Sequence, residues 1–132
     1  MSTEVTEMSR VIAWFEIPAH DFERAARFYE AALDVSLRRD VFGDVPMALF
    51  GHAEADTGGC IVFNPPESRP HADGVLVYLN AKPSVTAALD RVEKAGGKKL
   101  GPAVELPNNY GYIGHFIDSE GNRVGLHAPK LA

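Results

Sequence analysis

The sequence predicts an α+β protein in which two β-α-β-β-β modules follow one another within a single domain. Two amphipathic helical segments are each preceded by one short apolar run and followed by three, and both sets keep the same order. The opening runs start at Trp14 and Gly74. In a chain of 132 residues this spacing indicates an internal duplication, because a solenoid needs about three repeats.

The first module is expected to cover about residues 11–64. The run 11–17 is β-branched and aromatic and ends at Pro18, which predicts a strand. In "DFERAARFYEAAL" the apolar residues recur at helical spacing, and Asp21 stands at the N-cap position. Glycine, proline and aspartate then separate three predicted strands, at about residues 35–40, 45–50 and 59–63.

The second module is expected at about residues 74–128, after a proline-rich linker at residues 65–73. A strand at 74–79 precedes the helical segment "PSVTAALDRVEKAGG", which has Pro83 near its first turn and Gly96 and Gly97 at its end. Three strands are predicted after it, at 98–105, 111–118 and 122–127. The whole domain then spans residues 11–129, and the polar residues 1–10 are expected to form a flexible tail.

Composition excludes several function classes. The net charge is −5 and the basic residues are scattered, so neither nucleic acid nor an anionic membrane surface is an expected partner. The polar start of the chain does not fit a signal peptide, and the single Cys60 excludes an intrachain disulfide, so a cytoplasmic protein is expected. No Walker loop, Rossmann fingerprint or nucleophile elbow is present.

The segment "DSEGNRVGLHAP" predicts the geometry of the last hairpin. Asp118 and Asn122 flank a three-residue loop with Gly121 at the left-handed position. This loop sets the register Phe116 to Val124, His115 to Gly125 and Ile113 to His127. Because side chains alternate along a strand, one face is expected to pack under a helix, and the other to carry His115, Arg123, Gly125 and His127 toward a pocket.

Three stretches, "WFEIPAHDFERAARFYEAAL", "GVLVYLNA" and "GHFIDSEGNRVGLHAP", resemble the vicinal oxygen chelate superfamily, which includes glyoxalase I, extradiol dioxygenases and bleomycin resistance proteins. The resemblance covers about residues 11–129 and is greatest to small bacterial glyoxalase-like proteins. It implies modules with a curled mixed sheet and an outer helix. These would form a cup around a small-molecule site, often completed by a homodimer.

The resemblance also implies a divalent metal held by the first and last strands of each module. Those positions fall on Trp14, Cys60, Gly74 and Gly125, of which only Cys60 offers a side-chain donor, and a soft one. The expectation is therefore a small-molecule binding protein, similar to the bleomycin resistance members, with no cofactor. Glyoxalase I activity is not expected.

An enzyme of the lyase, isomerase or dioxygenase type is the alternative. His115 and His127 would act as general acid and base with Glu16, because an unperturbed imidazole has a pKa near 6.5. The same three side chains would also make a relocated divalent metal site of two histidines and one carboxylate. The competing interpretations are that both histidines are structural and that Glu16 pairs with Arg123.

The expected ligand contacts are aromatic and lie near these residues. Trp14 is expected to serve as a stacking platform, with Cys60, Arg123 and Gly125 lining the site. In "ELPNNYGYIG", Tyr110 and Tyr112 would close over a planar ligand, unless the segment is an ordinary connecting loop. The competing interpretation of Cys60 is a small buried apolar residue. The remaining histidines, at positions 20, 52 and 71, are expected at the solvated surface. An interaction module without a ligand is a third possibility.

Overall fold

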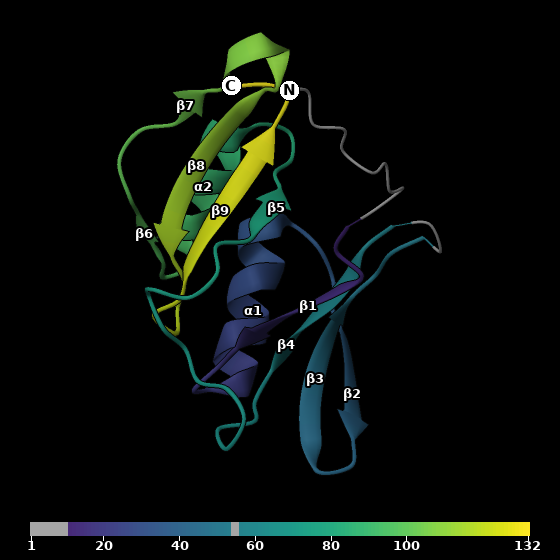
Figure 1. The fold of residues 1–132 in the computed structure, drawn as a ribbon. Coiled ribbons are helices and arrows are strands. Elements are labelled where there is room, and N and C mark those ends of the chain that lie inside the picture. The colour runs from purple at the N-terminus through teal and green to yellow at the C-terminus, as the bar shows by residue number, and fades with distance from the viewer. Residues whose placement is uncertain (1–10, 54–55) are drawn as a thin grey trace, which may run out of the picture.

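The computed structural model describes residues 11–53 and 56–132 and contains two mixed sheets, each covered on one face by a helix (Figure 1). The first module forms β1 (Trp14–Pro18), α1 (Phe22–Leu33), β2 (Arg38–Phe42), β3 (Val45–Phe50) and β4 (Gly58–Val62). The second forms β5 (Tyr78–Asn80), α2 (Val85–Lys94), β6 (Lys98–Lys99), β7 (Val104–Glu105), the 3-10 turn η1 (Pro107–Asn109), β8 (Tyr112–Ile117) and β9 (Arg123–Ala128). The α+β class and the repeated order are confirmed, while the expected tail at 1–10 lies outside the described residues.

Both sheets have the same plan. The first has the order β1-β4-β3-β2, and the second has the order β5-β9-β8-β6 with β7 also paired to β8. In each module the opening strand runs parallel to the closing strand, β1 with β4 and β5 with β9, while the other pairs are antiparallel. The mixed sheets implied by the resemblance are present, as two separate sheets that do not close into one.

Both helices begin at the polar caps that their sequences provide. The Asp21 side chain accepts a hydrogen bond from the Arg24 amide at the start of α1. The Ser84 hydroxyl does the same for the Ala87 amide at the start of α2, so Pro83 precedes the cap. Gly96 follows α2 with a φ of +103°, a left-handed conformation that glycine adopts without strain.

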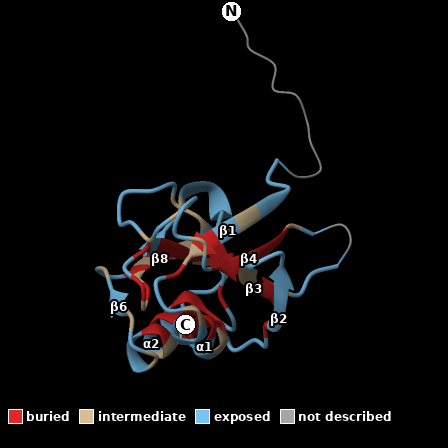
Figure 2. Cartoon of the chain, turned by 90° about the horizontal axis from the view of Figure 1, so that it is seen from below, coloured by how far each residue is buried: buried red, intermediate tan, exposed pale blue. Residues whose placement is uncertain are grey.

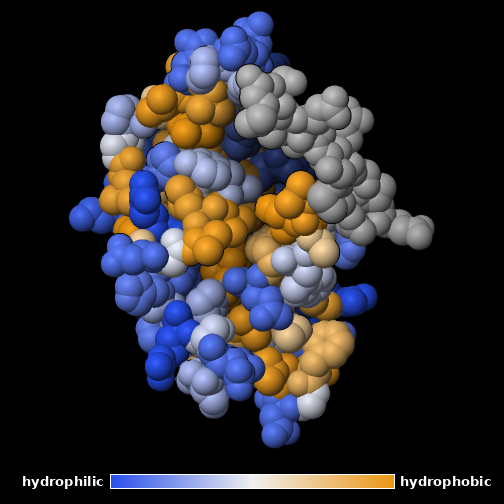
Figure 3. All heavy atoms as spheres, viewed as in Figure 1, coloured by the Kyte–Doolittle hydropathy of each residue, from blue (hydrophilic) through white to orange (hydrophobic). Residues whose placement is uncertain are grey.

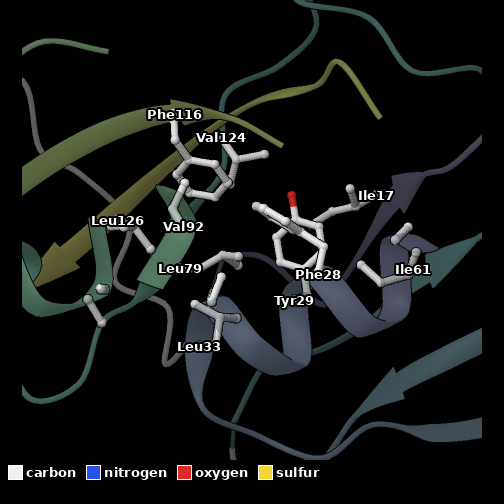
Figure 4. Close-up of a cluster of buried hydrophobic side chains, with 14 of the residues drawn as sticks. Ile17, Phe28, Tyr29, Leu33, Ile61, Leu79, Val92, Phe116, Val124 and Leu126 are labelled. Atoms are coloured by element: carbon white, nitrogen blue, oxygen red, sulfur yellow. The ribbon is translucent and has the colours of Figure 1, made fainter. Parts of the chain in front are cut away.

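The main core lies between the two helices and the two sheets, and it draws on both modules. Figure 2 shows the buried inner sides of the helices and strands, and Figure 4 shows the side chains that meet there. Phe28, Tyr29 and Phe116 form a group of mutually tilted or edge-on rings with centroids 4.9 to 6.3 Å apart. Since α1 supplies two of these rings and β8 the third, the two modules share one core.

The turn between β8 and β9 joins the second module to the first helix. Its register is the predicted one, and Gly121 has a φ of +99°. The buried Asp118 accepts hydrogen bonds from the Tyr29 hydroxyl and from the Asn122 side chain. Glu120 accepts from the amides of His20 and Asp21 at 2.9 and 2.7 Å. The turn residues therefore hold the start of α1 against the hairpin.

Glu120 also forms an ion pair with Arg24, whose Nε lies 2.7 Å from Oε2, and its side chain is fully buried. Burial alone would raise the pKa of the Glu120 carboxyl. The hydrogen bonds from Arg24, the Asp21 amide, Ser119 and the His20 amide outweigh that effect and lower the pKa to about 2. The folded protein therefore favours the ionised carboxylate of Glu120 over the protonated form.

Two predicted strands differ from the structure. The strand expected from Gly74 begins only at Tyr78, because residues 72–74 form a turn and Val75 is 93% exposed. The strand expected at 98–105 is interrupted between β6 and β7. Gly101 there has a φ of +70°, and Pro102 has no amide proton to donate to a ladder. Within the described residues, no helix is long and apolar enough to span a membrane.

Candidate functional site

Each sheet has one face toward the helices and one face away from them, which we call the open face. On β1, Phe15 and Ile17 pack into the main core, so Trp14 and Glu16 lie on the open face. On β8, Phe116 enters the core and His115 lies on the open face. Figure 3 views the molecule from the side of the sheets that is away from the helices, and apolar residues gather over its middle.

A pocket of about 440 Å³ lies on the open face of the first sheet. We call it the first-sheet pocket; its lining includes Trp14, Arg38, Phe42, Leu49 and His52. Trp14 and Phe42 are 44% and 55% exposed, so two aromatic side chains are available to a ligand. The structure places Trp14 in a pocket, as the sequence suggested, and adds three polar or aromatic neighbours that the sequence analysis did not single out.

A glycine of β4 makes room for this arrangement. Trp14 pairs with Gly58 in the parallel register of β1 and β4. A Cβ atom at Gly58 would lie 2.6 Å from the His52 ring and 2.9 Å from the Trp14 ring, both closer than real contacts allow. His52 is exposed, as expected, and its ring also packs beside this glycine and lines the pocket.

Arg38 gives the first-sheet pocket a positive charge, and no described carboxylate forms an ion pair with it. The two neighbouring arginines of β2 face opposite ways, because side chains alternate along a strand. Arg39 points toward α1 and forms ion pairs with Glu23 and Glu30, at 3.1 and 2.9 Å. Arg38 lines the pocket and has no ion pair among the described residues. The alternation in "LRRDVF" is the sequence signal for Arg38 and Phe42.

The second sheet repeats the aromatic-over-glycine arrangement. Tyr78 pairs with Gly125 in the register of β5 and β9, as Trp14 does with Gly58. A Cβ atom at Gly125 would overlap the Tyr78 ring. Tyr78 fills the space over Gly125, beside His115. Glycine is thus needed here for close packing of an aromatic ring.

Tyr78 and His115 form a hydrogen-bonded pair on this open face. The Tyr78 hydroxyl lies 2.6 Å from Nε2 of His115, and the two rings meet edge to face. Partial burial, and to a lesser extent the positive charge of Arg123, lower the pKa of His115. The lowered pKa favours the neutral imidazole, whose Nε2 accepts or donates the hydrogen bond to Tyr78 according to its tautomer.

The other expected catalytic groups have different partners. Nε2 of His127 lies 2.6 Å from the Tyr110 carbonyl oxygen and donates to it, which ties the turn after η1 to β9. Glu16 accepts from Nε1 of Trp14 at 3.4 Å, and no ion pair between Glu16 and Arg123 is present in the described part of the chain. His115, His127 and Glu16 therefore do not act on one another directly.

The expected ligand contacts of the 106–115 segment divide between the two sides of the sheet. Tyr110 is 66% exposed and free to contact a ligand. Tyr112 packs against the main core, on the opposite face of β8 from His115, which corrects its expected place in the site. Tyr112 is three residues from His115, and an odd spacing along a strand puts two side chains on opposite faces.

The residues to which the resemblance assigns the metal positions do not offer a set of donors that fits a divalent metal. Trp14 and Gly125 offer no donor, and Gly74 lies outside the strands. Cys60 is fully buried beside Leu49 and Val62, where burial, aided by the charge of Glu16, raises the pKa of its thiol to about 12. No group of three or more histidine, cysteine, aspartate or glutamate side chains in the described ranges could hold a metal ion. This includes the relocated site considered for Glu16 and the two histidines.

Known structures share this fold. A glyoxalase/bleomycin resistance protein from Albidiferax ferrireducens matches with a TM-score of 0.67 over 89% of this chain and 98% of that one, at 15% identity. A glyoxalase/bleomycin resistance protein from Streptomyces sp. CB03234 matches with a TM-score of 0.63 at 27% identity, over 89% and 99% of the two chains. A glyoxalase I mutant from Zea mays matches with a TM-score of 0.62 at 26% identity, and 45% of that longer chain is covered.

Sequence comparison leads to the same class. The family model for the Glyoxalase/Bleomycin resistance protein/Dioxygenase superfamily matches residues 11–126. A glyoxylase-like domain-containing protein from Didymella fabae is 32% identical over 117 residues, which cover 84% of this chain and 88% of that protein. The chain belongs to the Glyoxalase/Bleomycin resistance protein/Dioxygenase superfamily, which confirms the resemblance drawn from the sequence.

Proposed function

We propose that this protein binds a small molecule with a planar apolar part and an anionic group in the first-sheet pocket, without the family's metal. The observation that carries the proposal is that Trp14, Phe42 and Arg38 surround one pocket, with Arg38 in no ion pair among the residues that the structure describes. Its volume of about 440 Å³ falls within the range of about 300–1,000 Å³ that is typical of ligand sites.

Each of these side chains has a separate role in the proposed complex. Trp14 offers a flat apolar surface for a ring, and Gly58 keeps that surface free of an obstructing Cβ. Arg38 supplies a charge-assisted hydrogen bond, an interaction worth about 1.5–3 kcal/mol. His52 adds a polar ring at the wall. A neutral or cationic ligand would leave the Arg38 charge without a partner.

The family comparison is consistent with small-molecule binding rather than metal-dependent catalysis. The matching Streptomyces structure is a glyoxalase/bleomycin resistance protein, a name that joins an enzyme class and a resistance class. The donor set at the metal positions separates this chain from members whose chemistry depends on a metal, because only the buried Cys60 thiol has a donor there. This favours binding over metal-assisted turnover.

Calorimetric titration with trans-cinnamate and trans-cinnamamide tests the proposal, because the two probes differ in charge and share a planar ring. We expect cinnamate to bind more tightly than the amide. Arg38→Gln should weaken cinnamate binding by about tenfold or more and leave amide binding unchanged. Arg27→Gln is the matched control, since Arg27 is 78% exposed on α1 and its replacement makes the same charge change.

The proposal fails if cinnamate and cinnamamide bind the unmodified protein equally, or if neither binds. It also fails if Arg27→Gln weakens cinnamate as much as Arg38→Gln, because the effect would then follow net charge rather than the pocket. Phe42→Ala adds an independent arm. It should weaken both probes alike, since it removes apolar surface and no charge.

A second candidate function is proton transfer by the Tyr78–His115 pair, favoured by the 2.6 Å contact. Neutral His115 would accept the hydroxyl proton as Tyr78 takes a proton from an acidic C–H bond. The Tyr78 hydroxyl would then exchange with solvent, return a deuteron to the carbon and regain its proton from His115. Deuterium incorporation into dihydroxyacetone in D₂O, followed by NMR, tests this function. Exchange should be faster than in buffer and should slow with either Tyr78→Phe or His115→Gln; a buffer-level rate in the unmodified protein rejects it.

A further inference from the structure

A second pocket, of about 210 Å³, lies where the linker between the modules passes β1 and the start of β9. We call it the linker pocket. None of its lining residues belongs to the first-sheet pocket. Its walls combine polar and apolar side chains, among them Glu16, Arg69, His71, Val77, Arg123 and Val124. The linker, expected from the sequence only as a spacer, is thus one wall of a pocket.

One buried side chain fixes the segments that form these walls. Asn122 is 6% exposed. Its Oδ1 accepts from the His71 amide at 3.1 Å, and its Nδ2 donates to the Pro18 carbonyl at 2.8 Å and to Asp118 at 3.0 Å. The linker, the end of β1 and the last hairpin are therefore held by the same amide group. A ligand would meet walls that are already in place, which reduces the entropic cost of binding.

The charges in the linker pocket favour a single negative charge. Arg69 and Arg123 form no ion pair with any described residue, and Glu16 is the one carboxylate among the lining residues. Nδ1 of His71 accepts from the Asp73 amide at 3.0 Å, so the neutral ring carries its proton on Nε2 as a further donor. Two guanidinium groups against one carboxylate leave one positive charge.

We propose that the linker pocket binds a small monocarboxylate with a short apolar chain. Its carboxylate would accept hydrogen bonds from Arg69 and Arg123, because guanidinium groups match carboxylate geometry. Its apolar chain would lie against Val77 and Val124. Glu16 selects against a second negative charge, and the volume of about 210 Å³ limits the size of the ligand. This site is independent of the function proposed for the first-sheet pocket.

The probe is isobutyrate, with isobutyramide as its neutral counterpart and inorganic phosphate as a competing anion. Saturation-transfer NMR measures the dissociation constants. We expect isobutyrate to bind, and either Arg69→Gln or Arg123→Gln to weaken it by about tenfold. Glu16→Gln should strengthen binding severalfold, because it removes the opposing charge. Arg27→Gln should have no effect, since Arg27 does not line this pocket.

Several results would overturn the assignment. These are equal binding of isobutyrate and isobutyramide, tighter binding of phosphate than of isobutyrate, or no change in the two arginine variants. A loss of affinity on Glu16→Gln would also contradict it. If a glutamine variant unfolds, Arg69→Lys and Arg123→Lys replace it, and each should retain part of the affinity because the charge remains.

Discussion

Replacing Glu120 with glutamine tests how the last turn holds the first helix. The Glu120 carboxylate is fully buried, pairs with Arg24 and accepts two amides at the start of α1. Its pKa falls from an ordinary value of 4.5 to about 2 on folding. A pKa difference of about 2.5 units corresponds to about 3 kcal/mol of folding free energy.

The direction of the pH effect follows from this lowered pKa. The stabilisation is fully present above about pH 4.5 and is lost as the pH falls toward 2, because the unfolded chain then binds the proton more readily. Glu120→Gln should lower the free energy of unfolding by about 2–3 kcal/mol at pH 7. It should also remove most of the loss of stability between pH 5 and pH 2.

Urea unfolding followed by circular dichroism at several pH values measures both effects. Glu105→Gln is the matched control, since Glu105 is exposed on β7 and should leave the pH profile almost unchanged. If Glu120→Gln and the unmodified protein lose stability in parallel as the pH falls, the carboxylate does not couple the turn to α1. The reasoning would then be refuted.

Three further predictions follow from the open faces. Gly125→Ala should displace the Tyr78 ring and lower the free energy of unfolding by about 1–3 kcal/mol, measured by urea unfolding. It should also raise the pKa of His115, which becomes more exposed, and NMR titration measures this pKa. An unchanged His115 titration would contradict the packing described. Gly58→Ala should reduce the affinity for cinnamate measured by calorimetry, because the added Cβ collides with the Trp14 and His52 rings. Gly43→Ala is the control and should cause no such loss, since a Cβ there meets no atom within 4 Å. Cys60 should react with Ellman's reagent only when the protein unfolds, since burial raises the pKa of its thiol to about 12. Fast labelling of the folded protein would show instead that the Cys60 thiol is accessible to solvent.

Local sequence signals predicted the parts of the fold that depend on neighbouring residues. Asp21 marked the start of α1, and the turn residues set the β8–β9 register, including His115 opposite Gly125. Both rest on short-range chemistry, namely an N-cap and a three-residue loop with a left-handed glycine. The prediction of one strand at 98–105 was less accurate. The Gly101-Pro102 pair interrupts this strand, and the extent of the interruption depends on how its two parts pair with β8.

The candidate site was less predictable because its contacts join residues far apart in the chain. Gly125 was placed on the pocket face, but no local signal could show that the Tyr78 ring packs over it. The hydrogen bonds of the buried Glu120 carboxylate likewise join it to the start of α1, about a hundred residues away in the chain. Arg38 and Phe42 were detectable from alternation alone, yet only the sheet order shows that they face Trp14 and His52.

Trp14 provides the most direct measurement of the central claim, which is that the first-sheet pocket binds a planar anion. It is the only tryptophan in the chain and lines that pocket, so its fluorescence reports on the site itself. Titration with trans-cinnamate should change the Trp14 emission in a saturable way, with the midpoint shifted to at least about tenfold higher concentration in Arg38→Gln. A linear, non-saturating change, or identical midpoints in the two proteins, would contradict the account.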